Sequence, residues 1–196
     1  MKKIFILKLF LTFYLTNFNI AYSISPDVFI QSTVNRASKI LSENISKIEK
    51  INRLKKIALE TVDIRGIGFY TLGAYRKQMN ADQLKTYATL FEQYFLKSFS
   101  SRLAEYSNPE IEVNSKKKLN EKYTMVSSTL VATNQRPEVK IDWRIYTKNP
   151  EKPLIRDLII EGLSLARTQK EEFSSIIQTN DGDINALFDT LKKFIN

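Results

Sequence analysis

Asp157 and Glu161 are the two carboxylates whose type and spacing come closest to a catalytic pair. They lie in segment 154–162, where crowded apolar residues predict a β-strand. Residues four positions apart on one strand share a face but are separated by about 13 Å. The acid–base pairs of glycosidases need about 5–9.5 Å. We therefore predict no catalytic pair here. Glu161-Gly162 is instead expected to end the strand, because glycine allows the chain to turn there towards a helix.

The remaining composition excludes most other catalytic chemistry. The chain contains no cysteine and no histidine, which excludes thiol nucleophiles, disulfides, zinc sites of the Cys/His kind and His-based acid–base catalysis. Neither Ser127-Ser128 nor Ser174-Ser175 lies in a G-x-S-x-G context, and there is no Walker loop. The acidic turn at 180–183 lacks the other ligands of a calcium loop. We therefore expect that the protein is not an enzyme and that it binds neither a metal ion nor a cofactor. One alternative stays open, a small α+β-cone hydrolase or isomerase with Asp142 or Asp157 as the base.

The first 23 residues have the pattern of a cleavable signal peptide. A short basic start precedes an apolar run that ends in small residues. We expect cleavage, export to the periplasm and a single domain over 24–196. Loss of the leader's lysines at 2, 3 and 8 lowers the formal net charge from +9 to +6. For an exported protein, this basic charge favours an anionic membrane surface or an acidic partner over nucleic acid.

The order of the predicted elements indicates an α+β fold. Apolar residues at helical spacing over 26–60 predict helix with a break near 42–46. Asp63 is expected to cap a short helix, and Asn80, with a glutamine three residues later, a longer one. Apolar and β-branched patterns then predict strands at 111–113, 122–133, 138–147 and 153–162. Short connections make neighbouring strands antiparallel. The helical first half should pack on a curved antiparallel sheet of about four strands, followed by C-terminal helices.

The long helix after Asn80 carries many aromatic residues on one broad face. The strand at 139–145 alternates, with Val139, Ile141, Trp143 and Ile145 on one side. Such a helix facing such a strand predicts a wide apolar slot. Its residues either fill a core or line a cavity.

Several ordered motifs together resemble the MlaC/toluene-tolerance family. Leu72-Gly73 precedes the aromatic–basic pair Tyr75-Arg76. A strand with Asp157 leads to Glu-Gly-x-Ser at 161–164, and a Phe-x-Ser-Ile-Ile-type helix covers 173–177. The likeness extends over about 60–195. It implies a periplasmic phospholipid carrier that exchanges lipid with an outer-membrane lipoprotein–porin complex and an inner-membrane ABC transporter complex. In that family, acyl chains enter a cavity between sheet and helices, while the head group stays in water.

The apolar residues of the slot are our candidates for lipid contact, and we expect the protein to be a monomer. Arg136 and Glu161 match charged family positions near the rim, where they would dock a partner or lie near the head group. The alternative to a carrier, besides the hydrolase or isomerase above, is a non-catalytic adaptor that only docks other proteins. The lipid-binding candidates are Phe69, Tyr94, Phe95, Phe99, Met125, Val139, Ile141, Trp143, Ile145, Leu158, Ile160 and Leu163.

Overall fold

The computed structural model describes residues 23–196. The predicted signal peptide, apart from Ser23, lies outside the described residues, and the boundary of the domain at 24 stays a prediction. None of the helices within 23–196 is both long enough and apolar enough to span a bilayer. The elements are α1 (Pro26–Ser42), α2 (Lys47–Thr61), α3 (Ile64–Thr71), the 3-10 helix η1 (Gly73–Lys77), α4 (Ala81–Leu103), β1 (Ile111–Asn120), β2 (Tyr123–Leu130), β3 (Val139–Tyr146), β4 (Leu154–Ile160), β5 (Leu163–Ser164), α5 (Leu165–Gln178) and α6 (Ile184–Ile195).

Local signals place the helix boundaries where the sequence predicts them. The expected break over 42–46 separates α1 from α2, and the hydroxyl of Ser46 caps α2 by accepting from the Glu49 N–H. Asp63 caps α3. Asn80 and Gln83 form a complete capping box at the start of α4. Each of these caps satisfies N–H groups that have no partner inside the helix, so a few neighbouring residues decide where the helix begins.

The α+β prediction is confirmed, with one additional short strand. The sheet is antiparallel throughout, in the order β1-β2-β3-β4-β5. The predicted strand at 111–113 is too short, because β1 continues to Asn120. Its second half, with the lysines at 116–118, is exposed on both faces, so it shows no alternation. Charged lysines are common on edge strands, where they discourage pairing with another chain.

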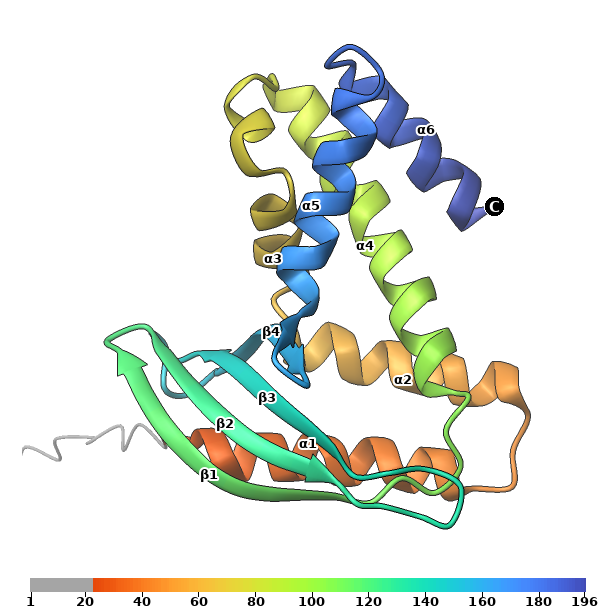
Figure 1. Cartoon of the computed structure of the whole chain (residues 1–196), viewed down its shortest axis with the longest axis vertical. Coiled ribbons are helices and arrows are strands. Elements are labelled where there is room, and N and C mark those ends of the chain that lie inside the picture. Colours follow the sequence, from red (N-terminus) through yellow and green to blue (C-terminus); the bar gives the residue numbers. More distant parts are fainter. Residues whose placement is uncertain (1–22) are drawn as a thin grey trace, which may run out of the picture.

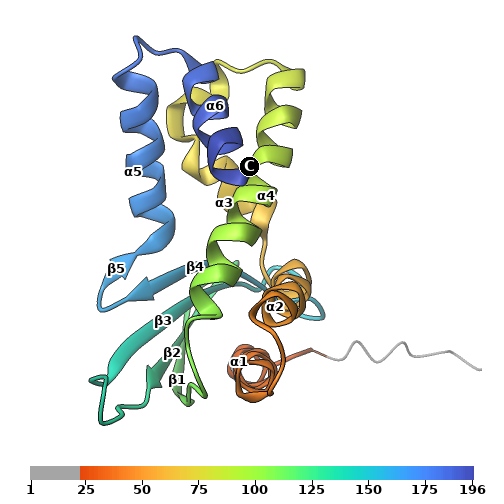
Figure 2. The same cartoon turned by 90° about the vertical axis from the view of Figure 1, so that its right-hand side faces the viewer.

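Two groups of helices contact the sheet differently. In Figure 1, α1 and α2 lie along the sheet, and α3, α5 and α6 gather around the first part of α4 beyond β4. Figure 2 shows α1 and α2 almost end-on beside the sheet. The last part of α4 descends to α2 (Figure 1), which it contacts. The helical group has its own aromatic core around Tyr87, Phe91 and Phe173. Tyr87 is fully buried and shares a hydrogen bond of 2.7 Å with Thr71, and burial raises the pKa of its hydroxyl.

Candidate functional site

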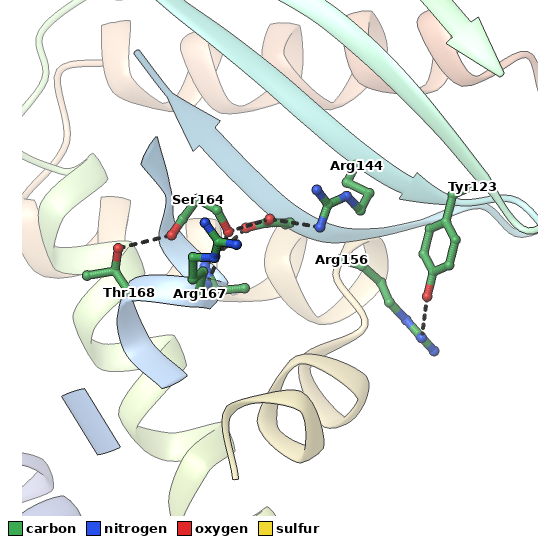
Figure 3. Close-up of polar contacts among 8 residues, drawn as sticks. Tyr123, Arg144, Arg156, Ser164, Arg167 and Thr168 are labelled. Atoms are coloured by element: carbon green, nitrogen blue, oxygen red, sulfur yellow. Dashed lines mark hydrogen bonds and ion pairs between the residues drawn. The ribbon is translucent and has the colours of Figure 1, made fainter. Parts of the chain in front are cut away.

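The carboxylates considered for catalysis have structural partners. Asp157 is buried and accepts hydrogen bonds from the Ser164 hydroxyl (2.7 Å), the Ala166 N–H (3.0 Å) and Arg144 (3.3 Å). Figure 3 shows this network between β4 and the start of α5. Asp142 accepts from the hydroxyl of Ser127 on the neighbouring strand. Asp157 therefore connects the sheet to α5, and Asp142 supports the β2–β3 pair.

Glu161 belongs to a tight turn. It has φ 49°, and Gly162 has φ 82°; the two residues connect Ile160 to its partner Leu163. Two successive positive φ angles are typical of two-residue hairpin turns. The Glu161 carboxylate accepts from the Lys140 N–H, and its own N–H donates to the Lys140 carbonyl. The predicted turn is thus present. The chain first makes the short strand β5 and only then enters α5.

An apolar cavity of about 140 Å³ lies between the sheet, α1, α2 and the end of α4. Its walls expose almost only apolar atoms, and no charged residue lines it within the described part of the chain. The face of β3 opposite to Asp142 points into it, because alternate strand residues face opposite sides. The residues that line it are Thr33, Val34, Ala37, Ser38, Leu41, Leu54, Ile57, Ala58, Thr61, Val62, Phe99, Leu103, Tyr106, Pro109, Ile111, Leu130, Ile141, Trp143, Ile155, Leu158 and Ile160.

Part of the predicted lipid-contact set meets at this cavity, namely Phe99, Ile141, Trp143, Leu158 and Ile160. Others lie close to it in the core without lining it. Phe95 stacks on Phe99 with ring centroids 5.3 Å apart, Ile145 is fully buried, and Val139 packs at the end of the same strand face.

The remaining candidates lie elsewhere. Tyr94 belongs to the aromatic core of the helical group, where its hydroxyl donates to Gln169. Phe69 lies beside Arg76 in the α3–η1 region. Met125 alternates with the buried residues of β2, and so faces away from them. Leu163 is 58% exposed in β5.

The residues that α1 and α2 contribute to the cavity were absent from the predicted set. On α1, Val34, Ala37 and Leu41 repeat at helical spacing, a signal that marks an apolar face. On α2, Leu54 and the pair Ile57-Ala58 show the same spacing. This pattern identifies the buried face of each helix. It does not reveal that this face lies opposite the sheet, across the cavity.

A polar groove adjoins the cavity along the edge strand β1. This groove, of about 640 Å³, shares Ser38, Pro109 and Ile111 with the apolar cavity. Its other walls carry amide and carboxylate side chains, among them Asn35 and Glu112. A polar space therefore continues directly from an apolar one.

Polar contacts hold α1 against β1 beside this groove. The amide of Gln31 donates to the Ile111 carbonyl (3.3 Å) and accepts from the Val113 N–H (3.2 Å), so it pairs with the free edge of the strand. Lys116 on β1 contacts Asp27 at 2.8 Å. Hydrogen bonding to Lys116 is the main cause that lowers the pKa of Asp27 to about 2. This carboxylate is therefore ionised at neutral pH, and the contact is an ion pair.

Arg136 lies beside a residue of the cavity wall that follows the end of α4. Its guanidinium is 5.6 Å from the ring centroid of Tyr106, which lines the cavity, and it donates to the Val131 carbonyl at 3.2 Å. Within residues 23–196 no carboxylate lies within 4 Å of it, and its buried Nε–H has no acceptor. Arg136 thus brings an unpaired positive charge next to an apolar wall.

Comparison with known proteins agrees with this architecture. The family model for the MlaC protein matches residues 31–193. The chain belongs to the MlaC family. Membership confirms the resemblance drawn from the Leu-Gly, Glu-Gly-x-Ser and Phe-x-Ser-Ile-Ile motifs.

Two relatives of this MlaC-family chain illustrate the match. The intermembrane phospholipid transport system binding protein MlaC of Haemophilus influenzae is 26% identical over 167 residues, which cover 79% of this chain and 78% of that protein. A phospholipid-binding protein of Ralstonia solanacearum, solved in complex with a phospholipid, superposes with a TM-score of 0.73. That match covers 88% of this chain and 97% of the other at 17% identity, so it concerns the fold.

Proposed function

We propose that this protein is a periplasmic phospholipid carrier whose acyl chains occupy the apolar cavity between the sheet and α1, α2 and α4. The uncharged, apolar lining of the cavity is the observation that carries the proposal. Each buried methylene contributes about 0.8 kcal/mol, so acyl chains supply ample driving force without any polar recognition. The relatives support the same ligand, because their names describe phospholipid-binding proteins.

The size of the cavity implies that the protein opens to load lipid. A dry engineered cavity of about 150 Å³ accommodates one benzene, so 140 Å³ is too small for two whole chains. We propose that the wall formed by α1 and α2 moves away from the sheet. The contacts of Gln31 and Asp27 with β1 keep this wall closed.

The polar groove next to the cavity is our proposed place for the head group. A lipid whose chains lie in the cavity would reach water past Ser38 and Ile111, which both spaces share. Arg136 adds a positive charge near the cavity, where it would attract the lipid phosphate. We retain Glu161 as a rim position for partner docking.

The proposed carrier exchanges lipid with an outer-membrane lipoprotein–porin complex and an inner-membrane ABC transporter complex. The predicted signal peptide and the word "intermembrane" in the name of the Haemophilus influenzae relative support this location. No nucleotide-binding motif occurs in the sequence, so release would come from a partner that changes the cavity. A partner can do so only by binding the open form better than the closed one.

Lipid extraction tests the proposal directly. Protein purified from cells without detergent should yield phospholipid when it is denatured in organic solvent and analysed by mass spectrometry. The ligand should reappear when stripped protein is incubated with phospholipid vesicles. Protein that is folded and lipid-free in both experiments would contradict the carrier function and favour the adaptor.

Removal of the Gln31 amide should accelerate lipid exchange. Gln31→Ala loses two hydrogen bonds to β1, each contributing about 1 kcal/mol. We expect the open form to be favoured by about tenfold or more, since each 1.4 kcal/mol is a factor of ten. Transfer of a fluorescent phospholipid between vesicles and protein should then be faster in both directions.

The matched control for this prediction is Ser32→Ala, an exposed residue of the same helix. Gln31 also lines the polar groove, so the two directions must be measured separately. Faster release with unchanged uptake would mean that Gln31 holds the head group rather than the helix.

A further inference from the structure

Two arginines share one phenylalanine ring on the surface formed by α3 and η1. The guanidinium carbons of Arg65 and Arg76 lie 5.2 and 4.5 Å from the centroid of Phe69. Both distances are within the range of cation–π contacts. The two positive groups are thus at most about 10 Å apart. At physiological ionic strength, where the Debye length is about 8 Å, their repulsion is only partly screened. An anion close to both would relieve it.

The same surface continues onto α5 through Lys170. Its ammonium lies 5.5 Å from the ring centroid of Tyr70, and its aliphatic part crosses Gly73 of η1. Gly73 has φ +55°, a backbone conformation that other residues rarely adopt, and Cε of Lys170 would lie 2.9 Å from a Cβ at this position. Tyr70 is 46% exposed. The contact places a third cation over Tyr70, the residue that follows Phe69 in α3.

The basic face is defined by these side chains and their neighbours. None of its cations has a carboxylate within 4 Å among residues 23–196, whereas the ion pairs of that part of the chain all involve other residues. Arg167 precedes Lys170 by one helical turn, and α3 and α5 are in contact. The basic face comprises Arg65, Phe69, Tyr70, Arg76, Lys77, Arg167 and Lys170.

We propose that the basic face docks the protein onto an anionic phospholipid bilayer. Without the leader the chain keeps a net charge of +6, and five of its cations belong to this face. Guanidinium groups match phosphate oxygens geometrically, and tyrosine beside phenylalanine suits the head-group level of a bilayer. This surface is separate from the lipid cavity, since none of its residues lines it. Docking would bring the carrier to the membrane, a step that the cavity alone does not provide.

Vesicle sedimentation tests this proposal with the full folded domain. Wild-type protein should sediment with phosphatidylethanolamine vesicles that contain phosphatidylglycerol, and it should be released by salt. The double substitution Arg65→Gln with Arg76→Gln should lower binding by about 25-fold, or about fivefold for each cation near a charged surface. Lipid taken into the cavity leaves with the soluble protein, so sedimentation reports docking alone.

The double substitution Lys117→Gln with Lys122→Gln is the matched control. It removes the same charge from the exposed β1–β2 end of the sheet, where neither lysine has an ion-pair partner among residues 23–196. Equal losses in both double variants would show that only net charge matters and would overturn the proposal. Wild-type protein that does not bind anionic vesicles at low salt would also overturn it.

A tryptophan probe at Tyr70 gives a second readout. The only natural tryptophan, Trp143, is buried, so Tyr70→Trp adds one exposed fluorophore. Its emission should shift to the blue on mixing with anionic vesicles, and the shift should disappear in the Arg65→Gln, Arg76→Gln background. An unchanged spectrum on sedimented protein would mean that another face docks. Lipid content measured by extraction should be the same in all these variants, so failure here leaves the carrier function intact.

Discussion

Ala37→Phe should yield a folded protein that no longer carries lipid. Ala37 lies on α1 and lines the apolar cavity. A phenyl ring resembles the benzene that a cavity of about 150 Å³ can hold, so it should fill most of the 140 Å³. Burying the ring stabilises the fold by about 1.5–3 kcal/mol, and strain from imperfect fit offsets about 1–3 kcal/mol. We therefore expect the free energy of unfolding to stay within about 2 kcal/mol of wild type.

The measurement is phospholipid content per mole of purified protein, with denaturation in urea as the check on folding. Ser32→Phe is the control, because Ser32 is exposed on the same helix and lines no part of the cavity. It should retain a full complement of lipid. An Ala37→Phe variant with normal lipid content would show that the chains bind outside this cavity.

Asp157→Ala should be the most destabilising single substitution in the polar network of Figure 3. Asp157 is 3% exposed, and its carboxylate accepts hydrogen bonds from the hydroxyl of Ser164, the N–H of Ala166 and the guanidinium of Arg144. Its loss leaves the Ala166 N–H buried without a partner and Arg144 without its counter-charge. A buried donor left without its acceptor costs about 1–3 kcal/mol, whereas Arg144 is 39% exposed and can be solvated. We expect the free energy of unfolding to fall by about that amount. Asp157→Asn should lose less, because its amide oxygen still accepts one hydrogen bond.

Urea unfolding followed by Trp143 fluorescence measures this loss. Asp142→Ala is the matched control on the adjacent strand, where a single hydroxyl bond to a partly exposed carboxylate is removed. It should cost about 1 kcal/mol. Equal stability of Asp157→Ala and wild type would contradict the structural role and would return Asp157 to consideration as a reactive group. The folded fraction of the variant should still contain lipid, since Asp157 does not line the cavity.

The contrast between Phe99 and Phe69 shows how far sequence patterns reach into the site. Both are aromatic residues on predicted helices, yet only Phe99 lines the cavity, while the ring of Phe69 contacts two arginines of the basic face. Leu163 follows the strand pattern but is exposed, because the chain turns at Glu161 before reaching it. An apolar pattern identifies a buried face of an element. It does not identify the neighbour that the face meets.

The sequence by itself determined the features that depend on neighbouring residues. The caps at Asp63 and Asn80, the alternation of β3 and the turn at Glu161-Gly162 follow from groups a few positions apart, whose hydrogen bonds form locally. The ordered motifs also determined the family. Only the tertiary structure decided which walls enclose the cavity, that Gln31 pairs with β1, and that cations of α3, η1 and α5 form one face. These features join residues distant in sequence, and packing of whole elements, rather than local backbone preference, brings them together.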